Sequence, residues 1–488
     1  MQIDHRNRAS LSRKIFKNSS IVLFGQAFSL LANLAVTVMM ARYLGEAGFG
    51  IFSYGLVFAS FFALIADFGM KPIIVRELAR DQWEPATFLG TAIIIRFLLS
   101  VFAILAALAS SKLAGYSGQY LAVIVLLALN ILFTAKLSTF RITFEAPFHA
   151  DIEMHWPMLL RMLDSALALL SIYLCVQFSV SLEIMVAAFV LSNAPGLLLN
   201  AILTCRRRPW RFQLDMRALR FLFKESLPIC FYTILVTFLG GVDVFLLKAM
   251  QGEEAVGLYA AATRLTTPLQ FIPHAIVVSL FPIFSRYHEQ TEGGVGRAFQ
   301  LGFKLILLLG LGFAMTTTFL APKIIALLYT DDFAASAQPF VLLMWSMVFL
   351  FLNFYFVDVL TSANLQKASF YVAAIMLLLN FPANWLLIHS HDIAGAAYAK
   401  LLAYAVGSAM LIYFVQKKYR FPGTGFWLRM VLLIVTFLAA AYYMQSASVI
   451  VALATSVLLF VVLIAALGVF DPEERATFMT LIRRKVRN

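Results

Sequence analysis

The chain has 488 residues, of which 62% are apolar and 13% charged, and its mean hydropathy is +0.87. No soluble domain of this length could bury so much apolar surface, whereas a bundle of membrane-spanning helices can. The net charge of +13 is spread over loops and both ends, where anionic lipid headgroups account for it, so nucleic acid is not an expected partner.

Fourteen long apolar segments follow one another along the chain. Their length and continuous apolar character predict α-helices, because strands that span a membrane are about ten residues long and alternate in polarity. The expected spans are 18–40, 47–70, 86–110, 119–139, 154–176, 180–203, 222–247, 255–280, 298–320, 336–361, 366–390, 393–415, 426–444 and 447–470.

Lysine and arginine lie mainly on one side of these spans. With a cytoplasmic N-terminus, 30 of the 38 basic residues fall in cytoplasmic segments or at cytoplasmic helix ends. The positive-inside rule therefore predicts that both termini are cytoplasmic. The basic residues expected on the outer side are Arg42, Lys112, Lys248 and Lys323.

Residues 42–52 (RYLGEAGFGIF) and 249–259 (AMQGEEAVGLY) indicate an internal repeat, each lying just before an even-numbered span. Six spans per repeat give both halves the same orientation, which predicts two lobes related by an axis along the membrane normal, with a central cavity. A shift of 207 residues aligns Gly45 with Gly252, Glu46 with Glu253, and Gly50 with Gly257.

The longest basic stretch, 205–225, divides the two repeats and is expected to rest on lipid headgroups. The predicted fold is an all-α polytopic membrane protein with two six-helix lobes and two further helices. Its domains are an N-terminal lobe over 1–205, a cytoplasmic basic linker over 206–221, a C-terminal lobe over 222–418, and spans thirteen and fourteen with a cytoplasmic tail over 419–488.

Four basic residues lie inside predicted spans: Arg96, Arg161, Arg264 and Lys400. A charge at the centre of a membrane helix costs about 3 kcal/mol or more, so these residues are candidates for function. Arg96 and Arg264 are expected near mid-depth without an acid one turn away, whereas Arg161 has Asp164 three residues later.

Basic side chains without carboxylate partners in a membrane cavity favour an anionic substrate. Asp67, Asp243 and Asp358 are expected nearer the membrane faces, out of reach of arginines at mid-depth. Guanidinium groups bind the charged oxygens of such an anion as forks. With Arg42 at the outer end of the first span, the candidate substrate-binding residues are Arg264, Arg96, Lys400, Arg161 and Arg42.

Prolines predict breaks in two spans. Span six contains Asn193-Ala-Pro195-Gly196, and span eight contains Pro268, Pro273 and Pro282 close to Arg264. Proline removes a backbone hydrogen bond and kinks a helix. Such kinks suit a helix that bends during alternating access, although a static kink accommodated by packing would carry the same sequence.

Four segments carry a family resemblance: RYLGEAGFG (42–50), DFGMKPIIVREL (67–78), QGEEAVGLYAAATRL (251–265) and LFPIFSR (280–286). They resemble motifs of the oligosaccharide flippases, the Wzx-type polysaccharide exporters of the MATE-like superfamily. The resemblance implies a carrier that moves an undecaprenyl-diphosphate-linked oligosaccharide from the cytoplasmic to the outer leaflet of the inner membrane by alternating access. The partners it implies are that lipid-linked oligosaccharide and membrane lipids, with a polysaccharide polymerase and chain-length proteins as further ones.

Two alternatives stay open from the sequence. A MATE-like drug or small-metabolite antiporter would share the fold, but it would more naturally expose carboxylates at mid-depth. A membrane glycosyltransferase, polymerase or ligase would need an extramembrane loop or domain, and the 321–335 segment with Asp331-Asp332 is short. The chain has no glycine-rich phosphate loop, and the spacing of His389 and His391 fixes no metal geometry, so we expect a transporter without cofactor or metal.

Overall fold

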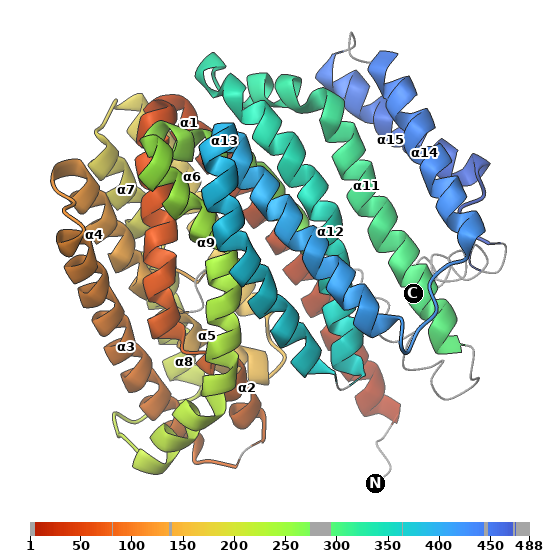
Figure 1. Ribbon diagram of the computed structural model, residues 1–488. Coiled ribbons are helices and arrows are strands. Elements are labelled where there is room, and N and C mark those ends of the chain that lie inside the picture. Colours follow the sequence, from red (N-terminus) through yellow and green to blue (C-terminus); the bar gives the residue numbers. More distant parts are fainter. Residues whose placement is uncertain are drawn as a thin grey trace. The chain divides into compact units, whose positions relative to one another are not determined.

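Figure 1 shows the computed structural model as a set of helices joined by short loops. Its regular elements, among the residues described, are α-helices and two short 3₁₀ helices, in agreement with the predicted all-α fold. The chain divides into two compact units, Met1–Ala260 and Ala261–Asn488. The described residues are 5–80, 82–135, 139–273, 294–363, 365–443, 448–471 and 474.

The first unit contains helices α1 to α8 and most of α9, which continues past the unit boundary. Helix α1 packs against α3, α4 and α6, and α2 packs against α5. The helix bounds are α1 His5–Asp67, α2 Met70–Arg80, α3 Pro85–Leu113, α4 Gly118–Phe133, α5 Phe140–Ala150, α6 His155–Gln177, α7 Leu182–Leu191, α8 Ala194–Arg207 and α9 Met216–Thr266.

The second unit is built around α12, which packs against α11 on one side and α13 on the other (Figure 1). Helices α14 and α15 pack against each other and against α11. The bounds are η1 Thr267–Gln270, α11 Gly294–Leu328, η2 Asp331–Ser336, α12 Ala337–Ser362, α13 Gln366–Val415, α14 Thr424–Tyr443 and α15 Val449–Ala466.

Ten helical stretches of the described chain are long and apolar enough to cross a membrane, and α4 is a shorter apolar helix. Three of the long helices, α1, α9 and α13, contain residues with non-helical backbone angles. These breaks lie at Gly45, at Gly252 and at His391-Asp392, each between two predicted spans. The count of fourteen crossings stays a prediction.

Two of these breaks occupy equivalent positions of the predicted repeat. Gly45 has φ 67° and Gly252 has φ 87°, and the backbone around both is otherwise helical. Side chains larger than hydrogen are disfavoured at such φ values, which explains why glycine stands at both positions. The 207-residue shift therefore relates two residues with the same unusual backbone conformation.

The residues after these breaks contact each other in a reciprocal way. A Cβ atom on Gly50 would overlap the carbonyl oxygen of Glu253, and one on Gly257 would overlap the carbonyl oxygen of Glu46. The 207-residue shift exchanges the two halves of this contact. Glycine is thus required at both positions for α1 and α9 to approach at backbone distance. The arrangement of the whole chain as two six-helix lobes stays a prediction.

The two proline-containing breaks also occur, as far as the described residues reach. Helix α7 ends at Leu191 and α8 begins at Ala194, one residue before Pro195. Helix α9 ends at Thr266, and the 3₁₀ helix η1 follows with Pro268 as its second residue. Pro282 and the motif at 280–286 lie outside the described residues.

The predicted basic linker forms hydrogen bonds and ion pairs with other segments of the first unit. The backbone amide of Arg211 donates to the carbonyl oxygen of Ala86 at 3.2 Å, and that of Asp215 donates to Thr91 Oγ1 at 3.0 Å. Three of the arginines at this end also pair with acids of neighbouring loops, namely Arg207 with Glu153, Arg208 with Asp151, and Arg211 with Glu84.

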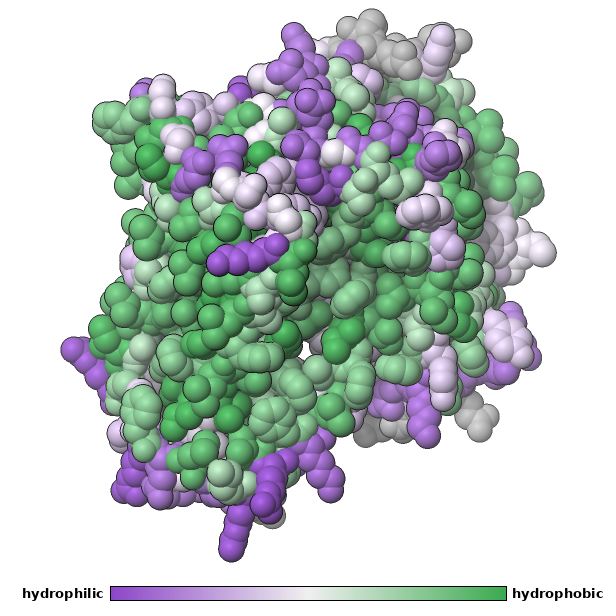
Figure 2. Space-filling view, turned by 60° about the vertical axis from the view of Figure 1, so that its left-hand side comes forward, coloured by the Kyte–Doolittle hydropathy of each residue, from purple (hydrophilic) through white to green (hydrophobic). Residues whose placement is uncertain are grey.

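Hydrophobic side chains cover the sides of the helices. On the face drawn in Figure 2 they fill the middle of the surface, and hydrophilic residues gather toward its ends. Helix α15 is the extreme case, because its mean hydropathy is 3.0 and only 11% of it is buried. This exposure is what a helix in contact with lipid requires.

Candidate functional site

A backbone break between α1 and α2 positions the first charged residues of the site. Phe68 and Gly69 both have positive φ, 44° and 69°. Gly69 lies directly against α9, where a Cβ would crowd the amide nitrogen of Cys230 and the carbonyl oxygen of Ser226. The break leaves Asp67 at the end of α1 and puts Lys71 in the first turn of α2.

Arg96 of α3 pairs with Asp67, contrary to the expectation that no carboxylate was within its reach. Arg96 Nη2 donates to Asp67 Oδ1 at 3.0 Å, and the Arg96 side chain is completely buried. The expectation was wrong because the break at Phe68 lets Asp67 lie against α3. Burial with a carboxylate offsets the desolvation of the guanidinium. Whether Arg96 also contacts substrate stays a prediction.

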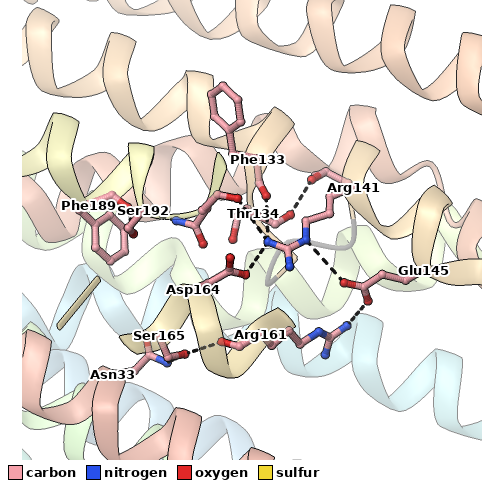
Figure 3. Close-up of polar contacts among 12 residues, drawn as sticks. Asn33, Phe133, Thr134, Arg141, Glu145, Arg161, Asp164, Ser165, Phe189 and Ser192 are labelled. Atoms are coloured by element: carbon pink, nitrogen blue, oxygen red, sulfur yellow. Dashed lines mark hydrogen bonds and ion pairs between the residues drawn. The ribbon is translucent and has the colours of Figure 1, made fainter. Parts of the chain in front are cut away.

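Arg141 of α5 is the centre of a buried network (Figure 3). The predicted spans place it in a cytoplasmic loop, yet its side chain is completely buried. Arg141 Nη1 donates to Asp164 Oδ2 of α6 at 2.5 Å. Gly196, just after the predicted break in span six, leaves room for this pair, because a side chain there would overlap both Arg141 and Asp164.

Arg161 also belongs to this network, with a different partner from the one expected. Arg161 Nη2 donates to Glu145 Oε2 at 2.5 Å, whereas its neighbour Asp164 pairs with Arg141 (Figure 3). The Arg161 side chain is 31% exposed, and the Glu145 side chain is completely buried. Glu145 lies 3.7 Å from Arg141 Nε, so one carboxylate joins the two arginines.

Lys71 of α2 is within electrostatic range of both groups of charges. It interacts electrostatically with Asp67 and Arg96 on one side and with Glu145 and Arg161 on the other. Its side chain is partly exposed. The first unit therefore contains a cluster of charged residues, which we call the α2–α6 charge cluster; its members are Asp67, Lys71, Arg96, Arg141, Glu145, Arg161 and Asp164.

Arg264 lies near the end of α9, three residues before η1, and belongs to the second unit. Among the described residues it has no hydrogen bond or ion pair, and the group that interacts with it electrostatically is Tyr329. The Tyr329 hydroxyl donates to the carbonyl oxygen of Ala261 at 3.1 Å. Arg264 thus matches the expectation of a basic residue without a carboxylate partner, within the described chain.

The two other candidates differ in exposure. Lys400 of α13 is buried, and Arg42 of α1 is exposed. Of the five predicted residues, Arg96 and Arg161 belong to the α2–α6 charge cluster, while Arg264 and Lys400 belong to the second unit. No group of three metal-ligating side chains occurs within the described parts of the chain.

Sequence reasoning missed Lys71, Arg141 and Glu145. The predicted spans leave 140–153 as a loop, whereas the structure has the eleven-residue helix α5 there, which is too short to be detected as a span. A weak signal was present, since Arg141 and Glu145 are spaced by four residues, which places them on one face of a helix. Lys71 belongs to the motif at 67–78, but it lies just beyond the predicted end of span two, so it was not a candidate for a charge inside the membrane.

Comparisons with known proteins agree with this fold. The family described as polysaccharide biosynthesis protein matches residues 15–288, and the MatE family matches residues 228–386. The chain is 22% identical over 425 residues to the probable low-salt glycan biosynthesis flippase Agl15 of Haloferax volcanii, covering 85% of this chain and 86% of that protein. It is 24% identical over 292 residues to a putative O-antigen transporter of Shigella flexneri, covering 57% and 68%.

Solved structures of transporters have the same fold. The lipid II flippase MurJ in its inward closed conformation gives a TM-score of 0.76 at 13% identity, covering 93% of this chain and 99% of that one. An inward-facing multidrug resistance MATE family transporter of the MOP superfamily gives 0.63 at 17% identity, covering 82% and 99%. The curated relatives are named as a flippase and a transporter, not as enzymes. Since the first family covers more than half of the chain, this protein belongs to the polysaccharide biosynthesis protein family, as a Wzx-type membrane transporter of the MATE-like superfamily.

Proposed function

We propose that this protein is a flippase that moves a polyprenyl-diphosphate-linked oligosaccharide from the cytoplasmic to the outer leaflet for assembly of a surface polysaccharide. The observation that carries the proposal is Arg264, an arginine in an apolar helix that has no carboxylate partner among the described residues. An arginine in a membrane needs water or an anion. A diphosphate supplies that anion, and its oxygens match the fork of a guanidinium group.

The position of Arg264 suits a contact that forms and breaks during transport. The α-helix ends two residues after it, and the 3₁₀ helix with Pro268 follows. A helix that is already interrupted can bend at lower cost than a continuous one. We therefore assign Arg264 as the main contact to the diphosphate in an alternating-access cycle. Arg96, Lys400, Arg161 and Arg42 stay predicted members of the substrate path.

A drug antiporter is the second candidate, because the MatE family also matches residues 228–386. A cationic drug would need a carboxylate that is available to it. The five carboxylate residues that are buried in the described chain all contact a basic or hydroxyl group already. The pairs are Asp67 with Arg96, Glu77 with Arg76, Glu145 with Arg161, Asp164 with Arg141, and Asp243 with Tyr259. This distribution favours the anionic substrate.

The orientation is part of the proposal. We place both termini in the cytoplasm and the chain in the inner membrane, with fourteen crossings, on the distribution of lysine and arginine. Reporter fusions after residues 210 and 420 should read as cytoplasmic, and fusions after 115 and 330 as external. A fusion after residue 210 that reads as external would reverse the assignment of donor and acceptor leaflets.

A clean deletion tests the proposed function. It should leave the lipid-linked oligosaccharide in the cytoplasmic leaflet and abolish one surface polysaccharide, and the plasmid-borne gene should restore both. The polysaccharide is measured on gels, and the leaflet by access of a membrane-impermeant glycosidase to the lipid-linked sugar. Normal polysaccharide together with raised sensitivity to cationic drugs would instead support the antiporter. A polymerase and chain-length proteins are the partners we propose for the exported unit.

A further inference from the structure

The linker between the two repeats carries apolar side chains that the first unit does not cover. Phe212, Leu214 and Met216 are 79%, 41% and 57% exposed. Residues 209–215 have no regular secondary structure, and Met216 is the first residue of α9. Three exposed apolar side chains so close together in a polar segment indicate contact with lipid or with a partner.

The backbone of the linker is held directly against the start of α3. The carbonyl oxygen of Arg211 lies at Gly90, where a Cβ atom would overlap it. The hydroxyl of Thr91 donates to the carbonyl oxygen of Gln213 at 3.2 Å and accepts from the backbone amide of Asp215 at 3.0 Å. These contacts fix the position of the exposed apolar side chains relative to α3.

The length of α3 places this contact at the depth of the lipid headgroups. The helix has 29 residues, or about 43 Å at 1.5 Å per residue, which exceeds the hydrocarbon core of about 30 Å. Its first turns, which the linker crosses, therefore lie among the headgroups. Trp83, just before α3, and Trp210, just before Arg211, are both partly exposed. Tryptophan is enriched at this level of a membrane.

The same segment carries positive charge that the protein does not neutralise. Six arginines and one acidic residue lie between residues 206 and 221. Three of the arginines form the ion pairs with acids of neighbouring loops. Within the described residues the other three, Arg206, Arg217 and Arg220, form no ion pair, and all three are exposed. We call the exposed apolar and basic side chains together the linker surface; its members are Phe212, Leu214, Met216, Arg206, Arg217 and Arg220.

We propose that the linker surface binds anionic phospholipids of the cytoplasmic leaflet. Its arginines attract phosphate-bearing headgroups, and its apolar side chains enter the boundary between headgroups and acyl chains. A zwitterionic lipid would cover the apolar side chains but would leave the positive charge unbalanced, so the surface favours lipids of the phosphatidylglycerol class. The inference rests on the proposed orientation for the leaflet, but it does not involve Arg264 or depend on what the protein transports.

Lipid titrations of the full-length purified protein, followed by native mass spectrometry, test the surface. The probes are phosphatidylglycerol, phosphatidylethanolamine and undecaprenyl diphosphate. Arg217→Gln with Arg220→Gln should weaken binding of phosphatidylglycerol roughly thirtyfold, since each arginine near an anionic surface contributes about fivefold. Binding of phosphatidylethanolamine should not change. The matched control is Lys112→Gln, an exposed basic residue in the last turn of α3, at the opposite end from the linker; it should bind phosphatidylglycerol as the unchanged protein does.

A spin label at position 212 tests the contact with the bilayer. Phe212→Cys is labelled in protein whose own cysteines, Cys175, Cys205 and Cys230, are replaced by serine. In phosphatidylethanolamine nanodiscs that also contain phosphatidylglycerol, the label should be reached by oxygen and protected from a water-soluble nickel chelate. Without phosphatidylglycerol the protection should decrease. Full access of the chelate in both kinds of nanodisc would overturn the proposal.

The remaining outcomes separate this surface from a structural role and from the proposed function. The double arginine variant should keep its melting temperature without lipid, and a loss of several degrees would show a structural role and overturn the proposal. Unchanged affinity for phosphatidylglycerol would also overturn it. An affinity loss confined to undecaprenyl diphosphate would assign the surface to the transported lipid and refute the phospholipid. If the unchanged protein binds phosphatidylglycerol at this surface but no undecaprenyl diphosphate, the inference stands and the proposed substrate class is wrong.

Discussion

In the unit Met1–Ala260 five carboxylate residues are buried, whereas the charged residues buried in the described part of Ala261–Asn488 are Lys304 and Lys400. The first unit balances its buried arginines with acids, and those pairs join helices far apart in the sequence. In the second unit Arg264 has no carboxylate partner among the described residues. This contrast assigns the buried charges of the first unit mainly to stability, and Arg264 of the second unit to ligand binding.

Arg264→Ala should have the largest effect on transport. Two charge-assisted hydrogen bonds to a diphosphate are worth roughly 3 kcal/mol, or about a hundredfold in affinity. We expect polysaccharide export to fall to the level of the deletion, at normal protein abundance. Arg264→Lys should recover part of the activity, because lysine keeps the charge but loses the fork. The control is Arg297→Ala, an exposed arginine of the same unit, which should export normally. Normal export from Arg264→Ala would show that Arg264 does not bind the substrate, and the two units would then not differ in the role of their basic residues.

Arg96→Ala should act mainly on stability. It leaves Asp67 without the cation that lies 3.0 Å away, and breaking a buried pair in this way costs about 3–5 kcal/mol. We expect low protein abundance in the membrane and a lower melting temperature in detergent. Adding Asp67→Asn should restore most of both, because the remaining partner is then neutral. A stable Arg96→Ala protein that cannot export would instead place Arg96 in the substrate path, as first predicted.

Arg161→Ala should destabilise less than Arg96→Ala does. Its partner Glu145 is completely buried, but Arg161 is 31% exposed, so water can replace part of the lost interaction. The expected cost is about 1–3 kcal/mol, measured as a shift of the melting temperature without ligand. Glu145→Gln should compensate for it and Asp164→Asn should not. Compensation by Asp164→Asn would favour the pairing within one helix that the sequence suggested.

The sequence predicted the helical architecture well because hydropathy and glycine or proline breaks are local signals. The interruptions at Gly45, Gly252 and His391-Asp392 fall between predicted spans, and the break before Pro195 lies where expected. The repeat was visible because the same backbone conformation needs glycine in both halves. Features that depend on one turn or one kink could therefore be derived from residue types alone.

The partners of the buried charges could not be predicted in this way. Asp67 and Arg96 are 29 residues apart, and Arg141 and Asp164 are 23 apart, so their pairing depends on how helices pack. The nearest acid in sequence is not the hydrogen-bonded partner of Arg161, because Asp164 is bound by Arg141 and interacts with Arg161 only electrostatically. The prediction for Arg264 was simpler, since it required the absence of a nearby acid rather than the identity of one, and the described residues contain no carboxylate partner for it.

Lys304→Gln should have the smallest effect on stability and on export. This variant tests whether every buried cation of the second unit binds ligand. Lys304 of α11 is buried, but its ammonium donates to both carboxylate oxygens of Glu474 at 2.8 Å. When the lysine is lost, Glu474 still accepts a hydrogen bond at 2.8 Å from the backbone amide of Asp471, so the expected cost is about 1 kcal/mol.

The pair Lys304–Glu474 also provides its own control. Glu474→Gln should shift the melting temperature by a similar small amount, because Asp471 Oδ2 remains 3.6 Å from the buried Lys304 ammonium. The double variant should add little, because both changes remove one interaction. Export should be normal in all three variants, since Lys304 already has its anion. Loss of export in Lys304→Gln, at normal protein abundance and with Glu474→Gln unaffected, would show that Lys304 acts with Arg264 on the substrate. Basic residues of the second unit would then bind substrate even where they have a carboxylate partner. An ion pair would therefore not be evidence that a basic residue serves stability alone.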